Sequence, residues 1–340
     1  MTSERPSLGA PGTSERAAPG APVTSERPRL GAVVTGGAGF IGSRLVAALL
    51  KARWSVTVLD DLSTGRLDRL PLDAPDLRFV HGSITDQRDL DEAMRGNDVL
   101  FHLAAQVSVP ESIADPLRTD RVNVQGWAAT LRVADAHGIR AAVFSSSCSV
   151  YGDAQELPVS ERCPPSPQSP YAASKLTGEE MGYAWATPER GFVALRFFNV
   201  YGPDQDVGGA YAAVLAAFVE RARGGGSPTM FGDGLQTRDF VYVDDVVAAM
   251  ILAAERALKG ESFGPLNVGT GVAGTLLELW TVISGALGCA APPLHLPVRV
   301  GDIRHSCADV SLLREVLDWV PAISLRDGVA RLLDPVPTKG

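Results

Sequence analysis

The apolar positions after residue 30 fall into short continuous runs separated by stretches with helical spacing. "GAVVTG" at 31–36 and "SVTVLDD" at 55–61 are two such runs, and "FIGSRLVAALLKA" at 40–52 between them has helical periodicity. Strands that alternate with helices in this way predict an α/β fold with a doubly wound parallel sheet. Further runs lie at 98–105, 141–147 and 192–200, with helical stretches at about 120–137 and 171–187.

The pattern divides the chain into two predicted domains and a tail. Residues 31–200 carry the alternating elements and form a predicted nucleotide-binding domain. From 201 to 335, loops rich in glycine and proline predict a smaller substrate-binding lobe, from which about 239–270 returns to the first domain. Residues 1–30 repeat "TSER" three times, and we expect them to be disordered because they cannot bury enough apolar surface to offset their lost conformational entropy.

Composition narrows the classes of function. The 340 residues are 45% hydrophobic, which suffices for a large core, and their net charge is −8. An acidic chain argues against binding to nucleic acid or to an anionic membrane, and no apolar run is long enough to cross a bilayer. The four cysteines and five histidines show no metal-site spacing, so we expect reduced thiols, no metal and a cytoplasmic location.

A glycine-rich turn joins the first expected strand to the first expected helix. "TGGAGFIG" contains Gly36, Gly39 and Gly42, which let the backbone approach a pyrophosphate that rests on the helix N-terminus. The alternative, a turn without a ligand, is disfavoured by the acid that ends the next strand. Asp60 is placed there to bind ribose hydroxyls and to repel a 2′-phosphate, so NAD is favoured over NADP; Asp61 either shares this role or lies in a solvated turn.

A second pattern carries acid–base chemistry. "YAASK" places Tyr171 and Lys175 four residues apart, so on a helix both project from one face. With the serines at 145–147, which end an expected strand, they form a Ser-Tyr-Lys set. We expect the ammonium to lower the tyrosine pKa from about 10 toward neutrality, as a catalytic base requires.

From residue 31 to about 330 the chain resembles the extended short-chain dehydrogenases/reductases, in particular the NAD-dependent nucleotide-sugar epimerase/dehydratase family with its Rossmann domain. The stretches that carry the resemblance are "TGGAGFIGS", "VLDDLSTG", "HLAAQVSVPESIADP", "SSSCSVYG", "SPYAASK", "RFFNVYGPDQ", "GDGLQTRDFVYVDDV", "NVGTG" and "RVGDIRHSCAD". The resemblance implies NAD as cofactor, a UDP-sugar as substrate and a homodimer formed through paired helices.

The resemblance also assigns site residues. The implied cofactor contacts are Gly36, Gly39, Phe40, Ile41, Asp60, Asp61, Ser83, Ile84, Leu103, Ala104, Ala105, Tyr171 and Lys175. The implied substrate contacts are Ser108, Val109, Ser147, Asn199, Arg238, Arg299, Asp302 and Ser306. Arginines suit a diphosphate because the guanidinium forms paired hydrogen bonds with its oxygens. Many relatives have aspartate in place of Ser83, and Asp86 either replaces that adenine contact or caps the next helix.

The stretch "FSSSCSVYG" favours one reaction within the family. Ser147 aligns with the catalytic Ser/Thr, whereas Cys148 and Ser149 stand where 4,6-dehydratases carry Asp and Glu and where decarboxylases carry a Glu at the second position. A 4-epimerase needs no acid beyond the Ser-Tyr-Lys set, since hydride leaves C4 and returns to the other face of the 4-keto sugar. We therefore predict 4-epimerisation and interpret Cys148 as a small buried residue. The alternatives are a dehydratase or UDP-glucuronate decarboxylase and, from another class, a non-catalytic NAD-sensing protein.

One late position bears on the choice of sugar. Ser306 stands where the resemblance places tyrosine in enzymes restricted to plain hexoses and a small residue where N-acetylhexosamines fit. "GDIRHSCAD" and "GAYAAV" resemble the subgroup acting on UDP-N-acetylglucosamine, UDP-N-acetylgalactosamine or their uronic acids, alongside UDP-glucose 4-epimerases. Arg304 and His305 either contact an acidic substituent or face water.

Overall fold

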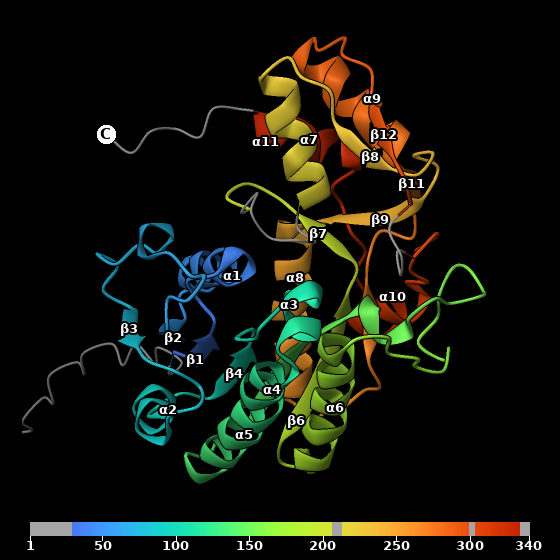
Figure 1. Ribbon diagram of the computed structural model, residues 1–340. Coiled ribbons are helices and arrows are strands. Elements are labelled where there is room, and N and C mark those ends of the chain that lie inside the picture. The colour runs from blue at the N-terminus through green and yellow to red at the C-terminus, as the bar shows by residue number, and fades with distance from the viewer. Residues whose placement is uncertain (1–28, 206–212, 299–302, 334–340) are drawn as a thin grey trace, which may run out of the picture.

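The computed structural model describes residues 29–205, 213–298 and 303–333 (Figure 1). Seven strands form one sheet in the order β10-β6-β5-β4-β1-β2-β3, and every neighbouring pair is parallel. This confirms the predicted doubly wound α/β fold. The strands are β1 (Gly31–Thr35), β2 (Ser55–Asp60), β3 (Leu77–His81), β4 (Val99–His102), β5 (Ala141–Ser147), β6 (Gly191–Phe197) and β10 (Leu266–Val268).

Helices cover both faces of this sheet, so its strands are apolar on both sides. Successive strand residues point to opposite faces: Val33 packs with the cluster that includes α2, α5 and α6, and Val34 packs with the cluster of α1, α8 and α10. The helices are α1 (Phe40–Lys51), α2 (Gln87–Met94), α5 (Gly126–Ala136), α6 (Pro170–Trp185), α8 (Val243–Ala257) and α10 (Ser311–Leu317).

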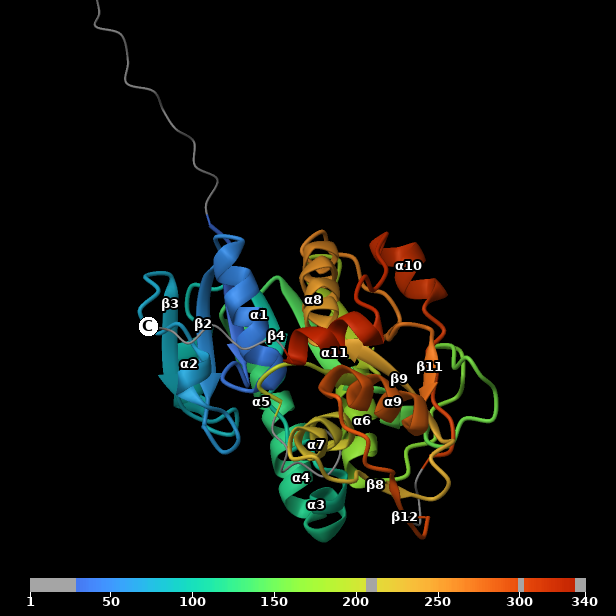
Figure 2. The same cartoon turned by 90° about the horizontal axis from the view of Figure 1, so that it is seen from above.

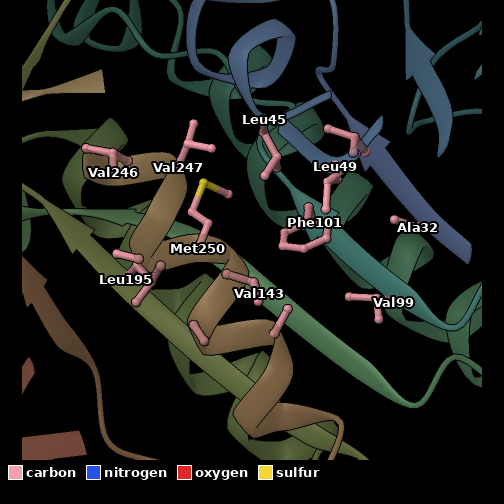
Figure 3. Packing of buried hydrophobic residues seen from close by; sticks show 14 of the residues in the cluster. Ala32, Leu45, Leu49, Val99, Phe101, Val143, Leu195, Val246, Val247 and Met250 are labelled. Carbon is pink, nitrogen blue, oxygen red and sulfur yellow. The ribbon is translucent and has the colours of Figure 1, made fainter. Parts of the chain in front are cut away.

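The larger core lies between the sheet and helices α1 and α8. Figure 3 shows Leu45 and Leu49 of α1 and Met250 of α8 directed onto Phe101 and Val143 of the sheet. All five side chains are fully buried. Because this core joins segments from both ends of the chain, it fixes the carboxyl ends of the strands relative to α1.

A smaller group of elements stands beyond the carboxyl ends of the sheet (Figures 1 and 2). Strands β7, β9 and β11 form one small sheet and β8 pairs with β12. Helices α7, α9 and α11 pack together beside them. The bounds are β7 (Asn199–Tyr201), α7 (Ala213–Arg223), β8 (Thr229–Phe231), β9 (Thr237–Tyr242), β11 (Ala273–Thr275), α9 (Leu276–Leu287), β12 (Leu294–Leu296) and α11 (Leu325–Leu333).

Part of the chain after β6 returns to the large sheet. Helix α8 packs on β5 and β6, and β10 then pairs with β6. The predicted disordered segment 1–30 lies outside the described residues except for 29 and 30. Across the described ranges, no helix combines the length and the apolar character that a membrane span requires.

Candidate active site

The turn between β1 and α1 is packed so closely that Gly36 and Gly42 have no space for a side chain. Gly36 has φ +71°, and a Cβ on it would lie 2.7 Å from the backbone nitrogen of Ala104. A Cβ on Gly42 would lie 2.2 Å from the carbonyl oxygen of Gly36. Helix α1 begins after Gly39 with no side-chain cap, so its first N–H groups remain available to an anion. Phe40 and Ile41 are half-buried beside the core clusters. The cradle fits the pyrophosphate of a dinucleotide.

Asp60 ends β2 and faces this turn. Its carboxylate accepts hydrogen bonds from the amides of Ala38 (2.9 Å) and Leu62 (2.9 Å), and the residue is 8% exposed. Burial raises the pKa of Asp60 above its ordinary value, and the two amides oppose the rise. Each carboxylate oxygen keeps a free lone pair, so the group can accept bonds from two hydroxyls. Asp61 is exposed and accepts from the Ser63 amide, as a solvated turn residue does.

In the turn after β3, Asp86 has the cap role, which is one of the two alternatives predicted from the sequence. Its carboxylate accepts from the amides of Arg88 and Asp89 and caps α2. The Ser83 amide donates to the Asp89 carboxylate (2.8 Å), and the Ser83 hydroxyl lies 2.9 Å from the hydroxyl of Thr85. Ile84 is buried in the core.

The segment after β4 lies at the same carboxyl ends of the strands as the glycine turn and Asp60. Residues 103–105 are half-buried, and the Leu103 amide donates to the Thr35 carbonyl (3.0 Å) at the end of β1. Ser108 then caps α3 (Val109–Ala114), where its hydroxyl accepts from the Glu111 amide (3.3 Å). A short helix α4 (Pro116–Thr119) follows. Because β1 and β4 are neighbours from which the chain runs to opposite sides of the sheet, this edge is its switch point, where such folds bind ligands.

Ser147, Tyr171 and Lys175 come together at the carboxyl end of β5. Helix α6 begins with Pro170 after a cap by Ser169, whose hydroxyl accepts from the Ala172 amide (3.1 Å). This start places Tyr171 in the first turn, where a hydrogen-bonding interaction links it to Ser147. Lys175 is 4% exposed, and its Nζ lies 5.8 Å from the centre of the Tyr171 ring.

The expected lowering of the Tyr171 pKa is wrong for this structure. Burial raises the pKa of Tyr171 to about 12, and the interaction with Ser147 only partly opposes the rise. The ammonium of Lys175 donates to the Ser145 carbonyl (2.8 Å) instead of to the phenol. Burial also lowers the pKa of Lys175 to about 8, although the charge of Glu179 raises it.

Side chains that were not predicted support this set. The Glu179 carboxylate accepts from Arg196 Nε (2.9 Å), Arg196 Nη2 (2.7 Å) and the Ser146 hydroxyl (2.5 Å). Asn123 lies in a π-helical turn and donates to the Ser174 hydroxyl (2.9 Å). Glu179 follows Lys175 by four residues, and Arg196 is the charge in the apolar run "FVALRFF"; both signals were visible in the sequence.

Of the predicted substrate residues, Asn199, Arg238 and Ser306 lie in the smaller group of elements. Asn199 begins β7 and donates to the Asp239 carbonyl (3.1 Å), and the neighbouring Arg238 of β9 donates to the Thr237 carbonyl (2.9 Å). The Ser306 amide donates to the same carbonyl (3.1 Å). Ser306 thus lies near Arg238. Arg299 and Asp302 lie outside the described residues.

Cys148 and Ser149 form the first turn of a 3₁₀ helix (Cys148–Tyr151) directly after Ser147. Burial raises the pKa of the Cys148 thiol to about 12, so it is protonated at neutral pH. The Ser149 hydroxyl is buried, and no hydrogen-bond partner for it is present among the described residues. A small pocket is lined by Cys148, Tyr151, Gly152, Ala154, Val159, Phe198, Ile303, His305 and Ser306.

Arg304 and His305 have partners of their own. Arg304 forms a paired bond with the Asp233 carboxylate (2.8 and 2.7 Å) at the surface. His305 is exposed, and its Nδ1 lies 3.1 Å from the Thr237 hydroxyl. In this structure both behave as surface loop residues. No cluster of metal-ligating side chains occurs within the described ranges.

The chain belongs to the NAD dependent epimerase/dehydratase family, whose model matches residues 32–269. This confirms the predicted family and its cofactor, NAD. Among curated proteins, the chain is 42% identical over 309 residues to a UDP-glucose 4-epimerase of Mycolicibacterium smegmatis, covering 88% of this chain and 96% of the relative.

Solved structures agree with this assignment. A UDP-N-acetylglucosamine 4-epimerase from Methanobrevibacter ruminantium, solved with UDP-N-acetylmuramic acid, superposes with a TM-score of 0.83 at 36% identity, over 90% of this chain and 98% of that one. A Thermus thermophilus UDP-glucose 4-epimerase, solved with NAD, gives 0.80 at 34% identity, over 90% and 100%.

Proposed function

We propose that this protein catalyses the NAD-dependent 4-epimerisation of a UDP-sugar through a transient 4-keto sugar. The observation that carries the proposal is the grouping of Ser147, Tyr171 and Lys175 beside the dinucleotide cradle, with a thiol and a hydroxyl at Cys148 and Ser149. Neither of these is an acid that elimination of water could use. The relatives named as 4-epimerases support the same reaction.

Each residue of the set has a distinct task. Tyr171 takes the proton of the C4 hydroxyl and returns it, Ser147 orients that hydroxyl by a hydrogen bond, and Lys175 supplies a nearby positive charge that favours the phenolate. NAD, when bound, supplies the acceptor and donor of hydride. Because the unliganded phenol has a pKa of about 12, the positive charges at the site must favour its ionised form during reaction.

The cofactor is held, in this proposal, by the glycine turn and by Asp60, with the predicted contacts along residues 83–84 and 103–105 beside it. Asp60 favours NAD over NADP because its charge repels a 2′-phosphate. Denatured protein should release NAD(H), or the cofactor-free protein should bind NAD in preference to NADP. Micromolar affinity for NADP and none for NAD would contradict the assignment.

The nucleotide of the substrate is UDP in this proposal, because several solved neighbours, the Methanobrevibacter ruminantium enzyme among them, hold UDP-sugars. Asn199, Arg238, Arg299 and Asp302 would hold the diphosphate and nucleoside, and Ser108, Val109 and Ser306 the sugar. A small residue at 306 leaves space for an N-acetyl group. The candidate sugars are N-acetylglucosamine or N-acetylgalactosamine, glucose or galactose, and the uronic acids.

A screen of these UDP-sugars with product analysis by NMR tests the proposal. The expected result is the C4 epimer of at least one substrate. An unsaturated or 4-keto product would identify a dehydratase, and loss of C6 from UDP-glucuronate would identify a decarboxylase. Binding of NAD without conversion of any sugar would support the non-catalytic alternative.

We also propose a homodimer in the cytoplasm. Exposed apolar side chains on α3 and α4, Ile113 (63% exposed) and Leu117 (76% exposed), support an interface there, and the four cysteines are free thiols. Light scattering during size-exclusion chromatography should give twice the mass of 35.8 kDa. A monomer at micromolar concentration would contradict the dimer.

A further inference from the structure

Glu179 is a buried charge that the Ser-Tyr-Lys set does not include. It follows Lys175 by four residues and Tyr171 by eight, so all three lie on one face of α6. The side chains of Glu179 and Arg196 are each 4% exposed. Removing two charges from water is costly, so such a pair is kept only with good geometry and further hydrogen bonds.

The Glu179 carboxylate joins three elements next to the reacting groups. Arg196 of β6 donates to both of its oxygens, at 2.9 and 2.7 Å, and the Ser146 hydroxyl of β5 donates at 2.5 Å. The residue before Ser146 offers its carbonyl to Lys175, and the residue after it is Ser147. The end of β5 is therefore tied to α6 at two successive positions.

Arg196 also contacts the segment that follows Ser147. Its guanidinium lies 4.7 Å from the centre of the Tyr151 ring, a cation–π contact. The Tyr151 hydroxyl donates to Asn267 Oδ1 (2.6 Å), and Asn267 Nδ2 donates to the Val159 carbonyl (2.9 Å). A continuous set of buried contacts thus runs from α6 to the loop that carries residues 148–159.

Several titratable and charged groups of α6 and of neighbouring elements surround Lys175 and Glu179. On α6 these are Tyr171, which is a neutral phenol here, and Glu179. From β4 comes His102, whose burial and whose proximity to Lys175 hold its pKa well below the ordinary value, so it is neutral. From β6 comes the Arg196 guanidinium, which is bound to Glu179. Glu179 is the carboxylate that opposes the effect of burial on Lys175.

We propose that Glu179 is a positioning residue: its carboxylate fixes the end of β5 against α6, and its negative charge keeps Lys175 an ammonium. Its part in catalysis rests on the proposed function, but the charge on Lys175 can be measured without turnover. Two substitutions break the same ion pair and change the charge near Lys175 in opposite directions. A purely structural role predicts no such difference of sign.

The experiment is the titration of Lys175 by NMR of protein labelled with 13C at lysine Cε. The chain has four lysines, and Lys175→Arg identifies the signal. Glu179→Gln leaves two buried cations, so the pKa of Lys175 should fall from about 8 by about 1 pH unit or more. Arg196→Gln leaves Glu179 uncompensated, so the pKa should rise. Shifts of the same sign, or no shift, would overturn the proposal.

The double variant Glu179→Gln/Arg196→Gln provides a second test if a single variant fails to fold, because it leaves no unpaired charge at this position. Its Lys175 should titrate below the wild type and above Glu179→Gln, since both the anion that raises the pKa of Lys175 and the cation paired with that anion are lost. An unchanged pKa would overturn the proposal. The matched control is Glu261→Gln. Glu261 pairs with Arg256 (2.6 Å), which stacks on Phe263 (5.5 Å), at the surface. It should leave Lys175 unchanged.

Kinetics separate this proposal from the proposed function. In Glu179→Gln we expect kcat to fall roughly 10- to 100-fold, with KM for the UDP-sugar within about 3-fold. The loss of activity at high pH should begin at lower pH, because Lys175 loses its proton earlier. Absence of epimerase activity in the wild-type protein would contradict the proposed function, and the titration result would still stand. Normal titration shifts with unchanged kinetics would refute the positioning role alone.

Discussion

The carboxyl ends of β2 and β5 both carry predicted site residues, but different parts of the chain hold them in place. At β2, backbone amides of Ala38 and Leu62 hold the Asp60 carboxylate. At β5, side chains of Lys175 and Glu179 on α6 hold the strand end. The cofactor end is thus determined by nearby sequence and by glycine, whereas the catalytic end depends on side chains that only the tertiary fold brings together.

This difference predicts separable losses. A substitution at the β5 end should stop the reaction and leave the cofactor bound. A substitution at the β2 end should weaken binding of the cofactor and leave the catalytic groups in place. The variants below test this separation, from the largest expected effect to the smallest.

Tyr171→Phe should abolish hydride transfer, with a loss of roughly 1000-fold or more, because the proton acceptor is removed and the ring remains. NAD content and UDP-sugar affinity should stay close to wild type. Stopped-flow absorbance of reduced cofactor and calorimetric binding check the two halves of this statement. Turnover near the wild-type rate would show that another base operates.

Ser147→Ala should lower kcat by about 10- to 1000-fold, through loss of one preorganised hydrogen bond to the reacting hydroxyl. The Ser147 hydroxyl also accepts from the Ser149 amide (3.2 Å), so a small change in stability is expected too. Steady-state kinetics together with thermal unfolding distinguish the two effects. A rate loss that merely follows a lower Tm would contradict the catalytic role.

Asp60→Asn should weaken NAD binding by roughly 10-fold, since hydrogen bonds to a charged acceptor are replaced by weaker ones. In the wild type, the raised pKa of Asp60 means that affinity is lost as pH falls through that pKa, above the ordinary 3.8. The variant should lack this dependence. Fluorescence titration with NAD at several pH values measures it, and an equal pH dependence in both proteins would refute the role of Asp60.

The pH dependence that Asp60 gives to the stability of the protein is opposite in sign to the pH dependence that it gives to NAD binding. An acid whose pKa is raised by folding binds protons more readily in the folded state. Asp60 therefore contributes to the stability of the cofactor-free protein at low pH, and this contribution is lost as pH rises through its folded pKa. Cofactor-free Asp60→Asn should lose less stability than the wild type as pH rises over this range.

Cys148→Ala should change kcat by less than about 3-fold, because the thiol is held protonated and a small apolar side chain can take its space. It serves as the control for Ser147→Ala at the adjacent position. Loss of turnover in Cys148→Ala would instead favour an elimination mechanism that uses the thiol.

The sequence predicted β1, β2, β4, β5 and β6 because each carries its own apolar run. Strand β3 was not predicted, since only one of its residues, Val80, is buried. The glycine turn, Asp60 and the family assignment also depend on local motifs. The short strands of the smaller lobe, such as Asn199–Tyr201 and Ala273–Thr275, have three residues each and no periodic signal, so only pairing in the fold defines them.

The catalytic end was predicted only in part. The spacing of Tyr171 and Lys175 places them on one helix face, but it does not indicate that Lys175 donates to the Ser145 carbonyl or that burial dominates the Tyr171 pKa. Glu179 and Arg196 are separated in sequence, so their pairing required the contact between α6 and β6. The individual contacts to cofactor and substrate stay predictions.

The pairing of β10 with β6 has a consequence for biosynthesis. Leu266–Val268 pairs with Leu195–Phe197, which the ribosome makes roughly seventy residues earlier. Until then β6 has an open edge, and Tyr151 lacks the partner that Asn267 provides. Such a distant contact closes slowly compared with local structure. During synthesis, the large sheet therefore stays incomplete until β10 has been made. Truncation of the chain within the smaller lobe should yield aggregation rather than a smaller NAD-binding protein.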